Sequence, residues 1–319
     1  MTRPRSAYLV VGLSLALAFG LSLAVGSVNL FALDDPNKAQ RILLDIRLPS
    51  AVLLALVGAA LGGSGAAYQG LLRNPLADPY LIGVAPGAGL GAVIAMVLHA
   101  PTPWIPPAAL FGAIAAVVIV YRLARVGGAA PVTTLILAGV AVGAFAHAFM
   151  SYLMLARQLE LRRVVDFLLG GYSLGGWEPV WSVLPYTVVG LGVVVVLARP
   201  LNVLQFGDEQ ASQLGLNVER VKLLLIVAAS LAAASAVAFK GVIGFVGLVV
   251  PHLVRLAVGP DYRRLVPLSI LGGAVALLVA DAIGRSMTAL HELPVGVVTA
   301  LGGAPFFLYL LRRVRQSYW

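Results

Sequence analysis

Residues that could carry out chemistry are few in this sequence and lie far apart. It has no cysteine, and its candidate metal ligands of the imidazole type are His99, His147, His252 and His291. They show neither an H-E-x-x-H motif nor a clustered metal-ligand spacing. The three lysines are Lys38, Lys222 and Lys240, and none sits in the G-K-S or G-K-T of a phosphate-binding loop. The sequence therefore predicts no catalytic residue, no metal site and no such ATP site in this chain.

The composition indicates a membrane protein. Over 319 residues the chain is 60% hydrophobic and only 11% charged, and its mean hydropathy is +0.97, whereas a soluble domain carries about 25% charged residues. Basic residues stand singly between apolar runs, without the basic face of a nucleic-acid-binding protein, so no nucleic-acid partner is expected.

Apolar runs of about 20 residues, the length of a membrane-spanning helix, give about ten predicted spans. They lie near 8–33, 48–71, 80–98, 105–121, 131–155, 180–198, 222–239, 241–258, 265–284 and 293–311. We therefore predict an all-α polytopic membrane protein, with residues 1–319 as a single transmembrane domain. The first apolar run is longer than the core of a signal peptide, so we predict that it is retained as a span.

The distribution of positive charge predicts the orientation. With the N-terminus inside, 14 of the 22 Lys and Arg residues fall on the cytoplasmic side and 8 outside, which favours both termini in the cytoplasm. Three outer arginines, Arg157, Arg162 and Arg163, form a local exception in segment 156–179. That segment is long enough for a surface helix, and its charges could face a partner.

Acidic residues within spans would indicate an ion-coupled carrier, because such groups are costly in lipid and usually functional. Asp281 alone falls inside a predicted span, and it lies four residues before Arg285 on the same helix face. This spacing predicts a structural ion pair. His147, midway along a span, is the one histidine that we consider as a contact for a haem-type solute.

Small residues four apart, as in Gly58 with Gly62, predict close packing of neighbouring helices.

The connection 200–221 is unusually polar for this chain. It predicts a short helix from Asp208 to about Leu216 with carboxylates in its first turn, which suits the helix dipole, and with Ala211 and Leu214 on one face.

Four segments together resemble one family of membrane permeases. They are RNPLADPYLIGVAPGA, GDEQASQLGLNVERVKLL, GVIGFVGLVVPHLVRLAVGPDYRRLVPLS and ADAIGRSMTALHELPVGVVTALGGAPFFLYLL. Their order and spacing resemble the FecCD-type permeases of ATP-driven (ABC) importers for iron-siderophores, haem and cobalamin. The resemblance implies a ten-helix subunit of a prokaryotic cytoplasmic membrane that dimerises around a central pathway. It also implies two cytoplasmic ATP-binding subunits, which bind the ATP and Mg, and an extracytoplasmic substrate-binding protein; no cofactor is expected in this chain.

The resemblance also implies three sets of site residues. The cytoplasmic gate would comprise Asn74, Leu76, Val132 and Thr133. Contacts to the ATP-binding subunit would come from Asp208, Glu209, Gln210, Ala211, Leu214 and Gly215. Docking of the binding protein would use Arg47 and Arg285, since the guanidinium fork suits a carboxylate. The chain departs from the family at Ser50, where a second Arg is frequent, and Arg41 or Arg162 would then compensate.

Several alternatives stay open at this point. An ion-coupled secondary transporter would need a buried carboxylate pathway, and a membrane scaffold or receptor would not need the polar loop 200–221. The sequence chooses neither among ferric siderophore, haem and cobalamin nor between a homodimer and a pair of close homologues. Pro251, His252 and Arg255 belong to the most distinctive motif, and we assign them packing roles only.

Overall fold

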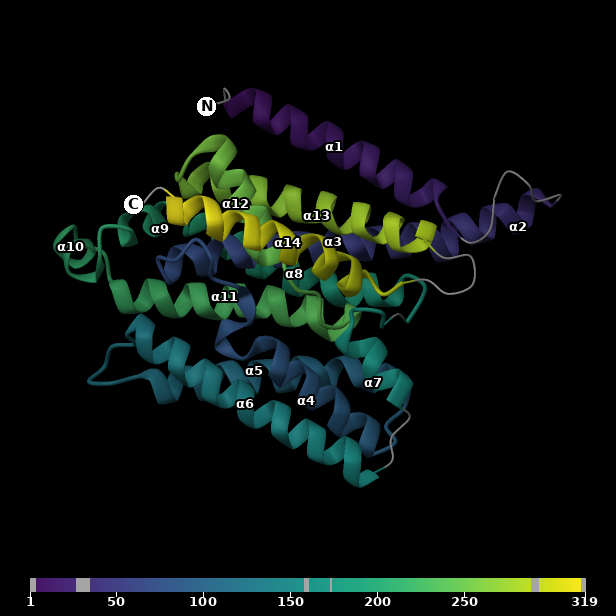
Figure 1. The fold of residues 1–319 in the computed structure, drawn as a ribbon, viewed down its shortest axis with the longest axis horizontal. Coiled ribbons are helices and arrows are strands. Elements are labelled where there is room, and N and C mark those ends of the chain that lie inside the picture. The colour runs from purple at the N-terminus through teal and green to yellow at the C-terminus, as the bar shows by residue number, and fades with distance from the viewer. Residues whose placement is uncertain (1–3, 27–34, 158–160, 173, 288–292, 317–319) are drawn as a thin grey trace.

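The computed structural model describes residues 4–26, 35–157, 161–172, 174–287 and 293–316. Within these ranges the chain is almost entirely helical, and its one β-type contact is an isolated bridge between Val126 and Ala129. The long helices run roughly along the longest axis of the molecule (Figure 1). This is the all-α fold that the composition predicts.

Seven helical stretches of the described chain are long and apolar enough to cross a membrane. They contain α1 (Pro4–Ala24), α3 (Leu48–Leu71), α5 (Ile105–Ala124), α6 (Val132–Arg157), α8 (Glu178–Val196), α11 (Val218–Lys240) and α13 (Tyr262–Met287). Three further apolar helices are α4 (Val84–Val97), α12 (Val246–Val258) and α14 (Val295–Gln316). Large apolar side chains such as Leu17, Phe111 and Leu155 are exposed on the outside of these helices, where lipid would cover them. The chain is a multi-pass membrane protein.

Short elements join the long helices. They are α2 (Pro36–Arg41), the π-helical turn η2 (Ile42–Arg47), the 3-10 turns η3 (Pro79–Ile82) and η4 (Thr102–Trp104), α7 (Leu161–Leu168), α9 (Ala198–Leu204) and α10 (Asp208–Gln213). The short helix α7 lies in the outer segment for which the sequence predicts a surface helix. By contrast, the predicted outer loop before the second span is helical, because α2, η2 and α3 follow one another without a break.

Close contacts between helix backbones hold the centre together. A Cβ placed on Gly58 would collide with the carbonyl oxygen of Gly273, and one on Gly62 would collide with the carbonyl oxygen of Ser269. These glycines let α3 lie directly against α13, which confirms the predicted close packing. On its other side α3 contacts α11. Helix α11 is mostly enclosed by the protein, since 78% of an apolar 18-residue stretch within it is buried.

Two predicted spans differ from the structure because the backbone breaks near their first residues. The span predicted at 80–98 begins instead with η3 and then α4, since Asp78 precedes a proline and Gly83 adopts a left-handed φ of 87°. The span predicted at 241–258 becomes helical only at Val246, after Phe245 with a φ of 68°. The helices α4 and α12 have 14 and 13 residues, fewer than the roughly 20 that cross the hydrocarbon.

The two broken segments meet and satisfy each other's polar groups. The hydroxyl of Tyr80 donates to the carbonyl of Ile243 at 2.9 Å and accepts from the amide of Ile243 at 3.4 Å. Helix α7 adds a partner, because the amide of Val242 donates to the carbonyl of Phe167 at 3.0 Å. Irregular backbone inside a membrane protein is stable where other protein groups satisfy it. The aromatic hydroxyl of Tyr80 is therefore part of the fold of this region.

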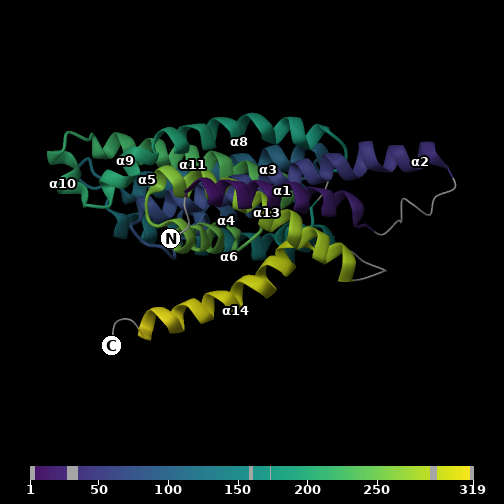
Figure 2. The ribbon, with the colours of Figure 1, turned by 90° about the horizontal axis from the view of Figure 1, so that it is seen from above.

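The bundle has two distinct ends. Helix α10 lies at one end and α2 at the other in both ribbon views (Figures 1 and 2). Helix α1 begins, and α14 ends, toward the end that carries α10 (Figure 1). The first span predicted at 8–33 is observed as α1, which ends at Ala24, while residues 27–34 lie outside the described part. Figure 2 also shows α14 leaving the bundle at an angle.

The glycine packing predicts the effect of one added methyl group. We expect Gly58→Ala to lower the stability of the solubilised protein by about 1–3 kcal/mol, because the methyl group must displace backbone. Gly192→Ala in α8 is the matched control, since nothing lies within 4 Å of its added Cβ. Thermal unfolding of the two variants in one detergent measures the difference; equal midpoints would contradict the close approach of α3 and α13.

Candidate functional site: two polar ends of the bundle

The turn between α3 and η3 is built around Asn74. Its side-chain oxygen accepts a hydrogen bond from the amide of Leu76 at 2.9 Å, and its carbonyl accepts from the amide of Ala77 at 3.1 Å. Asn74 itself is exposed, and Leu76 is half-buried. We call residues 73–76 the inner turn. The two predicted gate residues Asn74 and Leu76 therefore share one locally determined loop.

Two neighbouring groups fix the flanks of the inner turn. The imidazole of His252 in α12 lies close to the carbonyl of Pro75, so the histidine of the most distinctive motif packs beside the turn. On the chain that follows, the carboxylate of Asp78 accepts the amide of Tyr80 at 2.8 Å and caps η3. Burial raises the pKa of the Asp78 carboxyl to about 6, although the hydrogen bond from Tyr80 acts in the opposite direction.

Helix α10 forms at the predicted place but is shorter than predicted. It starts at Asp208 and ends at Gln213, because Gly215 takes a left-handed φ of 83° and the amide of Leu216 bonds back to the carbonyl of Ala211. The predicted shared face is wrong: Ala211 is fully buried inside this chain, whereas Leu214 is 69% exposed. Glu209 and Gln210 are exposed on the helix.

An exposed apolar pair flanks α10. Phe206, 66% exposed, precedes the helix, and Leu214 follows it. Both lie at the end of the molecule that carries α10, outside the helices that are long and apolar enough to cross a membrane. Large apolar side chains exposed on an otherwise polar connection are typical of a protein contact. The sequence analysis named Leu214 but missed Phe206.

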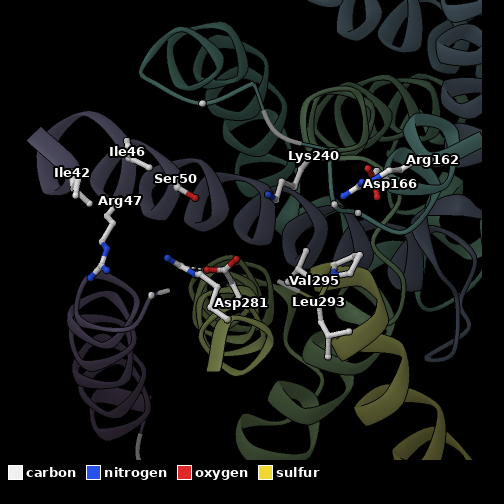
Figure 3. Close-up of a pocket in the computed structure, with 16 residues that line it drawn as sticks. Ile42, Ile46, Arg47, Ser50, Arg162, Asp166, Lys240, Asp281, Leu293 and Val295 are labelled. Carbon is white, nitrogen blue, oxygen red and sulfur yellow. Dashed lines mark hydrogen bonds and ion pairs between the residues drawn. The ribbon is translucent and has the colours of Figure 1, made fainter. Parts of the chain in front are cut away.

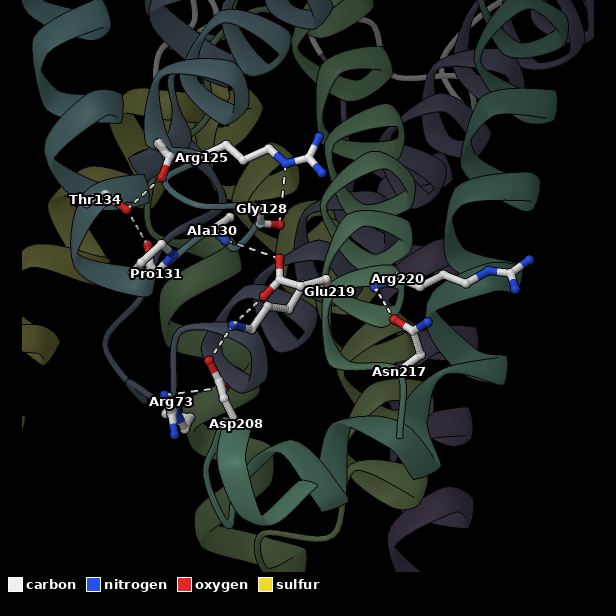
Figure 4. A network of polar contacts seen from close by, with 12 residues as sticks. Arg73, Arg125, Gly128, Ala130, Pro131, Thr134, Asp208, Asn217, Glu219 and Arg220 are labelled. Carbon is white, nitrogen blue, oxygen red and sulfur yellow. Dashed lines mark hydrogen bonds and ion pairs between the residues drawn. The ribbon is translucent and has the colours of Figure 1, made fainter. Parts of the chain in front are cut away.

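A polar network joins α10 to two other segments (Figure 4). The ammonium group of Lys222 lies 2.5 Å from an Asp208 oxygen and 3.5 Å from a Glu219 oxygen. Glu219 also accepts the amide of Ala130 at 3.1 Å, and Asp208 lies 3.6 Å from a guanidinium nitrogen of Arg73. The inner turn, α10 and the connection before α6 are thereby held together.

The second predicted gate segment follows that connection directly. Val132 and Thr133 open α6, where Val132 is half-buried and Thr133 exposed. The hydroxyl of Thr134 donates to the carbonyls of Pro131 and Ala124, at 2.8 and 3.0 Å, and fixes the start of the helix.

Further along α6, the Nδ1 of exposed His147 bonds the carbonyl of Gly143 at 2.9 Å. The proposed contact of this histidine with a solute stays a prediction.

The opposite end of the bundle contains a charged cavity of about 500 Å³ (Figure 3). The basic side chains that line it are Arg47, Arg162, Lys240 and Arg285, and the acidic ones are Asp166 and Asp281. They come from η2, α7, α11 and α13. Cationic and anionic groups far apart in the sequence therefore share one solvent-accessible hollow.

Within the cavity, the two predicted docking arginines hold the end of α1. Arg47 is only 5% exposed and donates to the carbonyls of Leu23 and Ala24 at 2.8 and 3.1 Å. Arg285 pairs with Asp281, as predicted, and donates to the hydroxyl of Ser22 at 2.9 Å. These guanidinium groups satisfy the last polar groups of a helix C-terminus.

The arginines considered as substitutes are more accessible. Arg41, at the end of α2, and Arg162, on α7, are both exposed. The structure thus brings Arg47 and Arg285 together but places them inside. Their docking role stays a prediction, as do the gate and coupling roles.

Sequence reasoning missed Lys222 and Glu219 as site residues. Their spacing of three residues in the first turns of α11 was a local signal for an ion pair. The contact of Lys222 with Asp208, 14 residues earlier, had no such signal, because it depends on how α10 folds back.

The fold and the two polar ends define a class of protein: a multi-pass membrane permease. Comparison with protein families matches residues 8–313 to the FecCD transport family. The chain belongs to this family.

Named relatives and a solved structure agree with this assignment. The chain is 48% identical over 278 residues to the cobalamin import system permease protein BtuC of Halobacterium salinarum, covering 87% of this chain and 75% of the relative. It is 40% identical to the hemin transport system permease protein HmuU of Yersinia pestis, covering 92% and 93%. A solved metal-chelate type ABC transporter in an inward-facing conformation superposes with a TM-score of 0.87 at 28% identity, covering 97% of this chain and 99% of that one.

The raised pKa of Asp78 predicts a pH-dependent variant. A carboxyl whose pKa is about 6 in the folded protein and near 3.9 in the unfolded chain favours folding at low pH and loses that contribution as the pH rises through 6. Asparagine keeps the cap but carries no charge. We expect Asp78→Asn to raise the thermal midpoint relative to the parent protein at pH 7.5 and to leave it nearly equal at pH 3.5, below the pKa of the unfolded chain. A difference that does not vary with pH would contradict a buried, charged Asp78.

Proposed function

We propose that this chain is the membrane-spanning subunit of an ATP-driven, binding-protein-dependent importer in a prokaryotic cytoplasmic membrane. Two cytoplasmic ATP-binding subunits would contact the end that carries α10 and supply ATP hydrolysis. A substrate-binding protein would deliver solute to the end that carries the charged cavity. The observation that best supports this arrangement is the exposed pair Phe206 and Leu214 around α10, fixed to the bundle by Asp208.

The solute class follows from the relatives. Their names specify cobalamin, hemin and, for a Bacillus subtilis relative 36% identical to this chain, Fe(3+)-citrate. We infer an iron chelate, haem or cobalamin as the transported solute. All three are bulky, and a pathway between two copies of the chain would offer them more room than the interior of one closely packed bundle.

A second copy of the chain explains the outer surface of α6. This helix packs on α4 and α5 through one side, and its other side exposes Thr133, His147 and Ser151. Polar side chains facing lipid are unfavourable. A homodimer would cover this surface or enclose water beside it, and α14, which leaves the bundle, would gain a packing partner.

The alternatives from other classes have less support. In an ion-coupled carrier a membrane carboxylate must bind and release an ion, but Asp281 is paired with Arg285. A scaffold or receptor would have no need of an apolar pair presented beside a buried charge network. Both alternatives would leave the chain functional without ATP-binding subunits.

The coupling role predicts loss of assembly when the apolar pair is made polar. We expect Phe206→Ser with Leu214→Ser to abolish co-purification of the ATP-binding subunits and ATP-dependent uptake in proteoliposomes, because the apolar contact is lost. The parent chain purified alone should hydrolyse no ATP.

Leu98→Ser is the control for this pair. Leu98 is 72% exposed at the far end of α4, so its substitution should leave assembly unchanged. If the Phe206 and Leu214 variant retains both its ATP-binding subunits and uptake, the contact lies elsewhere; ATP hydrolysis by the chain alone would contradict the proposed division of labour.

The docking role predicts two different responses to salt. Neutralising Arg47 and Arg285 to Gln should weaken binding of the substrate-binding protein by about 2 to 5 kcal/mol at low and high salt, as expected for desolvated charges. Neutralising exposed Arg41 and Arg162 to Gln should mainly slow association and flatten its salt dependence.

Binding kinetics measured by surface plasmon resonance on nanodisc-embedded transporter separate these cases. The thermal midpoint of each variant controls for loosening of α1. Parent-like affinity in the Arg47 and Arg285 variant would assign these arginines to capping α1 alone.

A further inference from the structure

Lys222 is a buried cation at the end of the bundle that carries α10. Its side chain is 2% exposed and its ammonium group contacts Asp208 and Glu219. The loss of water around a buried ammonium group is offset by close carboxylates. Its two partners are therefore held firmly in place, although each is itself partly exposed.

Each carboxylate extends to a different gate segment. Asp208 uses its second oxygen to reach Arg73, which immediately precedes Asn74 in the inner turn. Glu219 uses its second oxygen to accept the amide of Ala130, two residues before Val132. Lys222 is the group common to both connections, because its ammonium group contacts Asp208 and Glu219 alike.

The remaining contacts of the inner turn would let it move relative to α10 and α12. His252 of α12 lies beside Pro75, whereas the Arg73 contact with Asp208 is long and about 40% exposed on both sides. An exposed pair of this length contributes little alone. Displacement of α10 would therefore act on the turn through Asp208, which contacts Arg73 with one oxygen and is held by buried Lys222 through the other.

We propose that Lys222 is the positioning residue that couples α10 to both segments of the cytoplasmic gate. Movement of α10 by an ATP-binding subunit would shift Asp208, which Lys222 holds, and with it the inner turn through Arg73 and the start of α6 through Lys222 and Glu219. This inference rests on the proposed coupling role of α10 and on the proposed gate.

The first test measures coupling in the complete transporter, reconstituted in proteoliposomes with its ATP-binding subunits and its binding protein. Lys222→Met and Asp208→Asn should each leave ATP hydrolysis largely intact and reduce uptake, so that the ATP used per solute rises about fivefold or more. Lys222→Arg, which keeps the charge, should restore much of the uptake. Arg220→Met is the matched control, because its exposed side chain points away from the network (Figure 4).

The second test observes the gate directly. Because the chain has no cysteine, Leu76→Cys gives one spin-labelling site per copy. Pulsed electron paramagnetic resonance should show a distance between the two labels that changes when ATP binds to the parent complex, and that no longer changes in the Lys222→Met complex.

Three results would overturn the proposal. One is a parallel fall of hydrolysis, uptake and thermal midpoint in both the Lys222→Met and the Asp208→Asn proteins, which indicates a structural role only. Another is a nucleotide response of the Leu76 labels that survives in Lys222→Met. The third is a distance between the two Leu76→Cys labels that stays constant even in the parent complex while uptake proceeds, which also contradicts the proposed gate. The proposed function fails separately if the parent chain never assembles with ATP-binding subunits.

Discussion

The direct contact of α3 with α13 is the constraint on which the rest of the structure depends. Gly58 and Gly62 remove side chains from the crossing, so the two backbones meet where lipid provides no hydrophobic driving force for association. Helix α3 can then occupy the centre of the bundle, with α11 on its other side. Its position fixes Arg47 before its first residue and the inner turn just beyond its last.

The broken helices depend on this centre in turn. Without the continuous hydrogen bonding of a helix, residues 241–245 and the η3 turn need partners from elsewhere in the protein. Tyr80 provides one for Ile243, while Gln69 of α3 fixes the first turn of α12 just beyond by donating to the carbonyl of Leu248 at 3.0 Å. Both side chains reach their partners because α3 and η3 are already in place. The irregular backbone is therefore a consequence of the packing of α3 and not a local weakness.

The sequence predicts those parts of the structure that depend on local chemistry. Long apolar runs gave the helices, the spacing of Gly58 and Gly62 gave the close crossing, and the spacing of Asp281 and Arg285 gave their ion pair. The start of α10 at Asp208 also followed from its acidic first turn. The predicted fold class is confirmed by the helical structure, and the predicted family by the match to residues 8–313. Both were predictable because composition and long motifs can be read from the sequence without knowing which segments meet.

Features that depend on which segments meet in space were not predictable in this way. Ala211 and Leu214 share a polar loop, yet one faces the bundle and the other faces away, because Gly215 ends α10 within two turns. The breaks before α4 and α12 lie within apolar runs. Hydropathy cannot predict them, because it does not depend on backbone conformation and so does not reveal the left-handed φ of Gly83 and Phe245. Lys222 looked like an ordinary basic residue at a membrane boundary until α10 brought Asp208 against it.

At each end of the bundle, buried cations paired with carboxylates hold a short or terminal segment of the chain. At one end Arg47 and Arg285, with Asp281, hold the last carbonyls and Ser22 of α1; at the other Lys222, with two carboxylates, holds α10 and the connection before α6. In both cases the cation is buried while a short or terminal segment of backbone remains accessible. If partners bind at the two ends as proposed, each would meet the accessible segment before the buried charge and would act on the charge through that segment. The buried cations anchor each segment to the helices behind it, and under the proposed function the strength of this anchoring would set how much of a partner's binding free energy reaches those helices.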